Sequence, residues 1–351
     1  MSSLATNAIT DASGGNTATI NSYTPTESNM AGRNKIINGD MRIDQRNAGA
    51  SVTRNTLSNV YTLDRWNSRA EGADGVYTVQ QITDAPSGFV NSLKVTTTTA
   101  DAALGATQIY AIHQPIEGNN CSDFAWGTAD AKPITISFWI KSSLTGTFGG
   151  SVENANGSRA YPFSYEISSA NTWEYKTIAI SGDTTGTWET GNAIGLWVWF
   201  GLGVGATGSG TSGAWGVGPK YSATGAVSVI GTLNATWQIT GVQLEAGSVA
   251  TPFEHRMYGQ ELALCQRYYQ NLFPDIDMPV IRSQTSDTLR RATVFLKVSM
   301  RVSPTAVITD NSGVGTYSVV STTVDAVRNS CIAASAGSVP RVTGLTADAE
   351  L

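Results

Sequence analysis

Apolar and polar residues alternate in several separate segments of the chain. In 134–141, every second position holds an apolar residue, and Thr, Ser, Trp and Lys fill the positions between them. In 193–201, Ile194, Leu196, Val198 and Phe200 share one face, and Trp197 and Trp199 share the other. Because successive side chains of a strand point to opposite faces, this period of two predicts strands with an aliphatic face toward a core and tryptophans opposite.

Seven segments with strand character are separated by Gly, Asn and Asp, and they are 75–82, 93–98, 107–114, 134–142, 173–181, 193–202 and 235–244. Many short strands with no helical pattern between them are typical of a β-sandwich or jelly roll. The Gly-, Ser- and Ala-rich stretch 202–226 predicts a long loop. In 254–273, apolar residues recur at intervals of three and four up to Pro274, which predicts one helix.

The two ends of the chain differ from this central region. Residues 1–34 are polar, rich in Gly, Ser, Thr and Asn, and lack a useful period, which predicts an extended arm. After Pro274 strand patterns return at 291–300, 305–309 and 316–323. We therefore predict a mainly β protein with an N-terminal arm (1–34), a jelly-roll β-sandwich (35–253), a connecting helix (254–273) and a small C-terminal β-sandwich (274–351).

Composition narrows the possible partners. Charged residues make up 14% of the chain, against about 25% in ordinary soluble proteins, which suits sheets with polar, uncharged faces. The net charge of −5 and the lack of a basic cluster beyond Arg290 and Arg291 argue against a nucleic-acid partner. The N-terminus lacks the basic and apolar regions of a signal peptide, and the most apolar stretch, 193–203, is too short to span a bilayer. We expect no membrane insertion.

No motif for catalysis, a cofactor or a metal stands out. The cysteines Cys121, Cys265 and Cys331 lie far apart, without the spacing of a disulfide framework or metal site. A glycosidase would need two carboxylates across a cleft, and nothing in the sequence selects a pair among candidates such as Asp64, Glu189 and Glu245. Asp40 and Asp64 lie near turns, where a calcium ion in a sandwich could find oxygen ligands. We expect no enzyme, no cofactor and no metal site.

The nine tryptophans carry the main functional signal. An indole ring offers a flat apolar face to sugar C–H groups, so tryptophans on a polar, weakly charged surface are compatible with glycan binding. The candidate carbohydrate-binding residues are Trp139, Trp197, Trp199, Trp173, Trp188 and Trp215. The alternative is that these rings complete a second apolar layer or a subunit interface, where Trp is enriched.

Four segments resemble those of phage tail-fibre and related virion proteins. They are LATNAITDASGGNTATINSYTPTESNMAGRNKIINGDMRIDQRNAGASVT at 4–53, YTLDRW at 61–66, ITGVQLEAGSVATPFEHRMYGQELALCQRYY at 239–269 and GLTADAEL at 344–351. The resemblance implies a virion attachment protein made in the host cytoplasm, with a central jelly roll like that of carbohydrate-binding modules. It also implies a homotrimer that binds a host-surface glycan or receptor. The chain lacks a long repetitive shaft and heptads, which favours a short fibre, a knob or a decoration of the particle.

The arm would fix the protein to other tail or particle proteins. Two of its short pieces could add as strands to a partner's sheet, through Thr6, Asn7, Ala8, Ile9, Thr10, Ala18, Thr19 and Ile20. The small domain has a thin core, predicted from Val294, Phe295, Leu296, Val298 and Met300, which symmetric neighbours would complete. Two alternatives remain open: a structural or decoration protein without receptor binding, and a glycan depolymerase.

Overall fold

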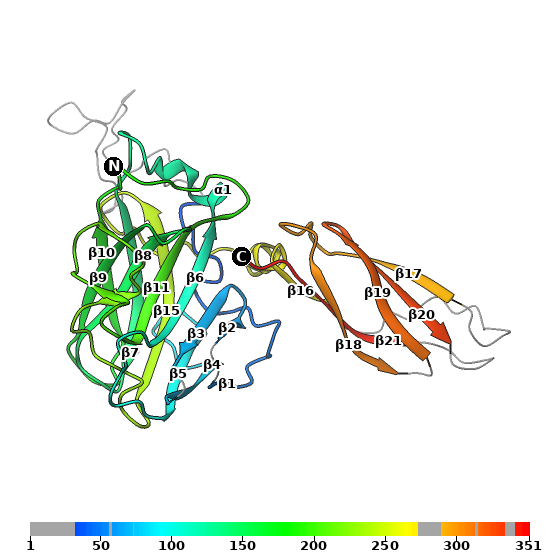
Figure 1. Ribbon diagram of the computed structural model, residues 1–351, viewed down its shortest axis with the longest axis horizontal. Helices are drawn as coiled ribbons and strands as arrows, with labels where there is room; N and C mark the ends of the chain where they lie inside the picture. Colours follow the sequence, from blue (N-terminus) through cyan, green and yellow to red (C-terminus); the bar gives the residue numbers. More distant parts are fainter. Residues whose placement is uncertain (1–31, 56–57, 73, 273–288, 313–314, 334–340) are drawn as a thin grey trace, which may run out of the picture.

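The alternating segments of the sequence form two antiparallel β-sheets that face each other in the larger part of the molecule (Figure 1). The computed structural model describes residues 32–55, 58–72, 74–272, 289–312, 315–333 and 341–351. The six-stranded sheet has the order β1 (Val52–Arg54), β4 (Val76–Ile82), β5 (Ser92–Thr99), β15 (Thr236–Ala246), β7 (Ile134–Ser142) and β10 (Glu174–Ile180). The seven-stranded sheet has the order β13 (Gly216–Val217), β9 (Arg159–Ile167), β8 (Gly146–Asn154), β11 (Ile194–Val204), β6 (Ile109–Glu117), β3 (Trp66–Glu71) and β2 (Ser58–Leu63).

The core of this sandwich lies between the two sheets, as the period of two predicts. Ile134, Ile136, Phe138 and Ile140 of β7 are fully buried, and so are Leu196, Val198 and Phe200 of β11. The Phe200 ring packs edge-on against the Phe138 ring of the opposite sheet at 5.2 Å between centroids. The prediction of a mainly β protein with a jelly-roll sandwich is confirmed.

The stretch predicted as a long loop folds back over the seven-stranded sheet. It contains β13 and a small parallel pair formed by β12 (Ser209–Gly210) and β14 (Ser222–Ala223). Backbone hydrogen bonds from Tyr221 N to Gly208 O and from Thr224 N to Gly210 O, both 2.8 Å long, hold it in place. A short helix, α1 (Gly118–Cys121), and a 3-10 turn, η1 (Ser122–Phe124), follow β6.

The helix of the sequence prediction is shorter than expected. It is α2 (Tyr258–Gln266), and residues 254–257 form neither helix nor strand. Residues Tyr269–Asn271 form strand β16, because their backbone pairs with strand β21 (Arg341–Asp348) near the C-terminus. No helix among the described residues is long and apolar enough to cross a membrane.

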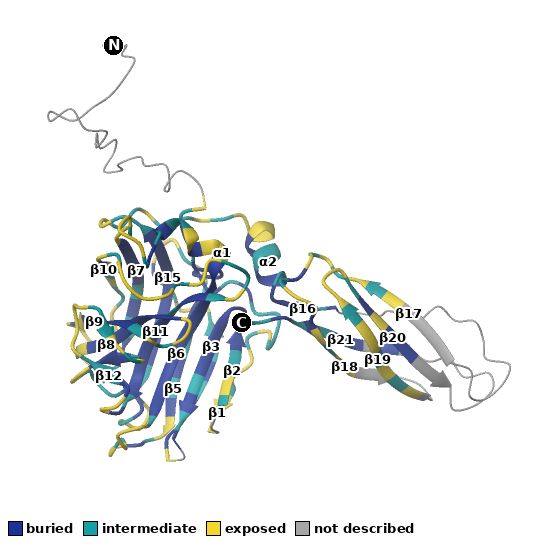
Figure 2. Ribbon diagram, turned by 45° about the horizontal axis from the view of Figure 1, so that its top comes forward, coloured by how far each residue is buried: buried dark blue, intermediate teal, exposed yellow. Residues whose placement is uncertain are grey.

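The C-terminal part is a small β-sandwich, as predicted. One sheet has the order β16, β21 and β18 (Thr305–Ser312), and the other has β17 (Leu289–Phe295), β20 (Ala326–Ala333) and β19 (Gly315–Thr323). Its core is thin, and much of it is only half-buried (Figure 2). Two expected core residues are not part of it. Phe295 is 77% exposed, because Val294 and Leu296 occupy the inward positions of the alternation, and Val298 is half-buried outside the core cluster.

The C-terminal tail runs back from β21 into the junction between the two β-parts (Figure 2). The Glu350 carboxylate forms ion pairs with Arg65 and, at 2.9 Å, with Arg46. The Arg65 side chain is only 1% exposed and lies over the Tyr268 ring at 3.7 Å. Such a buried, hydrogen-bonded set of charges fixes the tail in one position. The arm residues Thr6, Asn7, Ala8, Ile9, Thr10, Ala18, Thr19 and Ile20 lie outside the described residues.

Candidate functional site

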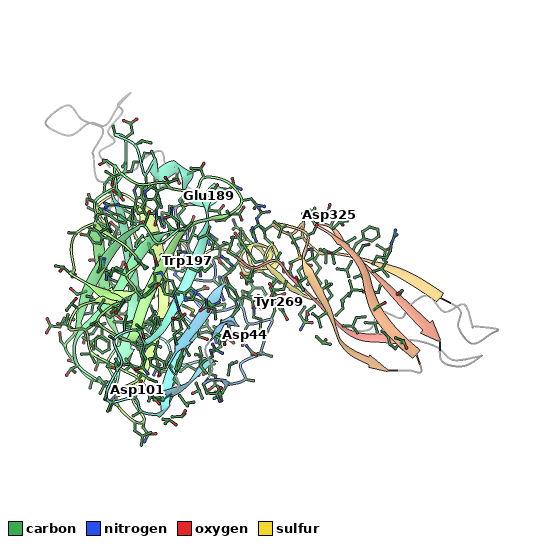
Figure 3. All side chains as sticks on the ribbon, in the orientation of Figure 1. Asp44, Asp101, Glu189, Trp197, Tyr269 and Asp325 are labelled. Carbon is green, nitrogen blue, oxygen red and sulfur yellow. The ribbon has the colours of Figure 1, made fainter. Side chains whose placement is uncertain are left out.

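The six candidate tryptophans fall into three separate groups on the large sandwich. Trp188 and Trp215 join Trp126 at one end of it. Trp139 of β7 lies on the outer face of the six-stranded sheet, and Trp173, which directly precedes β10, lies close to Lys141 of β7. Trp197 and Trp199 lie on the outer face of the seven-stranded sheet, where Figure 3 labels Trp197. The structure therefore does not bring all six together into one site.

The group at the end of the sandwich, Trp126, Trp188 and Trp215, stabilises loops. The Trp126 ring lies 4.6 Å from that of Trp188 and 5.2 Å from that of Trp215, centroid to centroid. The three indole N–H groups donate hydrogen bonds to the backbone carbonyls of Lys132, Thr185 and Ser181, respectively. With their only donors used on the protein's own backbone, these rings have an evident structural role.

The group on the six-stranded sheet borders a hollow of about 470 Å³. Its aromatic lining consists of Trp139, Tyr175, Phe89, Phe253 and His255. Gly241 forms part of the floor in a left-handed backbone conformation (φ 61°), and a Cβ there would lie 2.6 Å from the Phe89 ring. Trp173 lies outside this hollow, where its indole N–H donates to Asp84 and Lys141 lies over its ring. This hollow is largely apolar and offers few groups for polar recognition.

The group on the seven-stranded sheet borders a hollow of about 340 Å³, which we call the Trp197 hollow. The strand register places its side chains: Glu153 of β8 lies opposite Trp197 of β11, and His113 of β6 lies opposite Trp199. Its lining residues are Asn59, Arg69, Glu153, Ala155, Asn156, Gly157, Trp197, Trp199, Pro219 and Tyr221. They come from β2, β3, β8, β11, the β8–β9 turn and the segment before β14.

The two indole rings of this hollow have different roles. They stack at 5.5 Å with 28° between their planes. Trp199 is 2% exposed, because the His113 ring lies 4.0 Å and the Tyr221 ring 4.8 Å from it. Trp197 is only half-buried. Trp199 therefore packs against Trp197 from the protein side, and Trp197 is the ring that a ligand can reach.

The charged residues that line the Trp197 hollow, Arg69 and Glu153, differ in whether they form an ion pair. The Arg69 guanidinium lies 5.4 Å from the centroid of the Trp199 ring and pairs with Glu71 at 2.6 Å. Glu153 is 4% exposed and forms no ion pair within the described part of the chain. Burial raises the pKa of the Glu153 carboxyl to about 7, although the indole N–H of Trp199 and the charge of Arg69 favour its ionised form. Burial also lowers the pKa of His113, which is therefore neutral at pH 7.

The Trp197 hollow has the groups that a sugar requires. The indole face suits C–H groups, and the carboxyl and the side-chain amides of Asn59 and Asn156 can exchange hydrogen bonds with hydroxyls. Hydrolysis of a glycan needs two carboxylates, whereas Glu153 is the single carboxylate among the described residues that line the hollow. No group of three or more metal-ligating His, Cys, Asp or Glu side chains occurs among the described residues.

The carboxylates singled out from the sequence lie elsewhere. Asp64 accepts hydrogen bonds from Gln45 near the junction, and burial raises its pKa to about 6. Glu245 binds Thr251, Glu189 accepts from the backbone of Gly191, and Asp40 pairs with Arg42. Six residues at or beside this hollow were not predicted from the sequence as site residues: Arg69, Glu153, Tyr221, Asn59, Asn156 and His113. Only His113 lies in a predicted strand (107–114), because the strands that carry Asn59, Arg69 and Glu153 were not predicted.

Comparison with known proteins gives similarity of fold at low identity. No protein-family model matches the chain, and no curated protein matches it. A putative sugar binding protein from Bacteroides thetaiotaomicron is 12% identical over 61% of this chain and 100% of that one, with a TM-score of 0.36. A family 11 carbohydrate-binding module from Clostridium thermocellum is 13% identical over 60% of this chain and 99% of that one, with a TM-score of 0.28.

A phage protein is also among the similar structures. The enzymatically active domain of tailspike protein 4 from bacteriophage CBA120 is 13% identical over 61% of this chain, with a TM-score of 0.33. The match spans only 21% of that tailspike chain. Each of these proteins is one that this chain resembles over about three fifths of its length, and the resemblance does not extend to what any of them binds.

Proposed function

We propose that this chain is a carbohydrate-binding attachment protein on the exterior of a bacteriophage particle, and that the Trp197 hollow is its binding site. One observation carries the binding part of this proposal. A half-buried indole, a buried carboxyl without an ion partner and two side-chain amides converge on one hollow of about 340 Å³. Apolar rings with a few placed polar groups are the usual composition of a small-ligand site.

The particle part of the proposal rests on the sequence segments that resemble tail-fibre and related virion proteins. In this proposal residues 1–34 attach the chain to other particle proteins, and the Trp197 hollow contacts the host-surface glycan. The hollow lies on the large sandwich, so the sandwich and not the small domain carries recognition. The single carboxylate of the hollow favours binding over depolymerase activity.

Replacement of Trp197 by alanine tests the binding site. We expect at least a tenfold loss of affinity for a glycan that the wild-type protein binds on a glycan array, because the variant loses the exposed aromatic face (about 1.5 kcal/mol or more). The melting temperature should change little, since Trp197 is half-buried outside the inter-sheet core.

The matched control is Trp139→Ala in the hollow of the opposite sheet. It removes the same side chain from a comparable aromatic hollow, and we expect it to leave glycan affinity unchanged. A loss that follows Trp139 instead of Trp197 would move the site to the six-stranded sheet. No glycan binding by the wild-type protein, together with unimpaired phage adsorption by particles that lack it, would leave only a decoration role.

The predicted trimer has an independent test. Phe295 and Val307 of the small domain are 77% and 52% exposed, and the core behind them is thin. Burial of such side chains between copies would complete that core. We expect light scattering to give the mass of three chains for the wild-type protein and of one chain for Phe295→Asp. A monomeric wild-type protein would refute the trimer.

A further inference from the structure

We infer that the Trp197 hollow selects uncharged glycans over acidic ones, because its carboxyl, Glu153, lines the ligand space and the cation that lines the same hollow, Arg69, is already paired with Glu71. This inference rests on the proposed function and adds the class of ligand. It concerns sugars that differ only in whether they carry a carboxylate, such as a uronic acid and its neutral counterpart.

The backbone fixes the Glu153 carboxyl in place. Its cross-strand neighbours are Trp197 on β11 and Ala160 on β9. In the turn after β8, Gly157 has a φ of 68°, and a Cβ at that position would lie 3.0 Å from Glu153 Oε1. The turn thus covers one side of the carboxyl closely, and the carboxyl has few alternative positions away from the hollow.

The other charged and titratable groups around Glu153 do not cancel its charge. Arg69, from β3, is already paired with Glu71. Tyr221 keeps its proton, because burial raises the pKa of its hydroxyl. His113 is neutral, because burial lowers its pKa. Once Glu153 ionises, the set formed by Arg69, its partner Glu71 and Glu153 therefore carries one net negative charge.

The consequences differ for neutral and acidic sugars. A neutral sugar can donate its hydroxyls to the carboxylate, which is a charge-assisted hydrogen bond. A sugar carboxylate would meet a like charge on a side chain that is only 4% exposed, where solvent screens repulsion less than between fully solvated charges. The discrimination should weaken as the pH falls below about 7, the pKa of Glu153, because the protonated carboxyl carries no charge.

A glycan array tests this selectivity on the full chain. It should carry neutral oligosaccharides, the corresponding uronic-acid oligosaccharides and the methyl esters of those acids, which have the same skeleton without the charge. At pH 8.5 we expect the wild-type protein to bind the neutral sugars and the esters about tenfold more tightly than the acids. At pH 5.5 this ratio should fall toward one.

Two variants assign the effect to the carboxyl. At pH 8.5, Glu153→Gln should bring the ratio of neutral-sugar to acid affinity from about ten toward one. Part of this change is weaker binding of the neutral sugars, because their hydroxyls lose a charge-assisted acceptor. Glu166→Gln is the matched control, since Glu166 is exposed on β9 of the same sheet and outside the hollow. Equal wild-type affinity for acids and esters at pH 8.5, or a ratio that Glu153→Gln leaves unchanged, would overturn the inference. A protein that binds no sugar at either pH would refute the proposed function itself, and the selectivity with it.

Discussion

Glu350→Ala is expected to lower the free energy of unfolding by about 3–5 kcal/mol, the usual cost of removing one partner from a buried ion pair. The Glu350 side chain is 5% exposed, and Arg65, its partner, is 1% exposed. Without the carboxylate, the Arg65 charge would stay inside the protein beside the carbonyl of Pro115 and the Tyr268 ring, neither of which carries a compensating charge. The cost comes from that uncompensated charge and not from the contact alone.

Chemical denaturation followed by tryptophan fluorescence measures this effect. All nine tryptophans lie at or before position 237, so the signal reports the large sandwich, to which Arg65 belongs. Asp348→Ala is the matched control. Asp348 lies two residues before Glu350 and also pairs with Arg46, but its side chain is 40% exposed. We expect it to cost less than about 1 kcal/mol, as exposed ion pairs do. Equal losses for the two variants would show that burial does not set the cost.

Strand patterns in the sequence predicted five of the six strands of one sheet of the large sandwich, but only β6 and β11 of the other. The segment 134–142 coincides with β7, and its apolar positions are fully buried. Strand β8 was not predicted, since glycines occupy positions where a strand usually shows its pattern. A Cβ at Gly150 would lie 2.4 Å from the Phe163 ring, so the neighbouring strand supplies the apolar group. The pattern within one segment does not reveal that a glycine is needed there because a large ring of the neighbouring strand fills its space.

The candidate site was predictable only in part, for a related reason. Trp197 and Trp199 were placed correctly on the face away from the core, but the sequence could not show that Tyr221 covers Trp199. Arg69 and Glu153 lie 84 positions apart, on strands that two others separate. Strand order and register bring them to one hollow, and neither follows from alternation within a single segment.

Glu153→Gln is expected to stabilise the protein above pH 7 and to have little effect near pH 4.5. Burial raises the pKa of Glu153 to about 7 from its usual 4.5, so the folded state holds a proton that the unfolded state has released. In the wild-type protein the free energy of unfolding therefore falls as the pH rises from 4.5, where the unfolded state loses the proton, to about 7, where the folded state loses it too, and the loss is complete above that pH. Glutamine has no charge to bury, so the gain in the free energy of unfolding should reach up to about 3 kcal/mol at pH 8, at about 1.4 kcal/mol per pKa unit.

Chemical denaturation of both proteins between pH 4.5 and 8.5 measures the difference between their free energies of unfolding. The titration of Asp64 cancels from this difference, because both proteins contain Asp64. The exposed control, Glu166→Gln, should follow the wild type at every pH, and a gain from Glu153→Gln that is equal at pH 4.5 and pH 8 would contradict a buried carboxyl that ionises near neutrality.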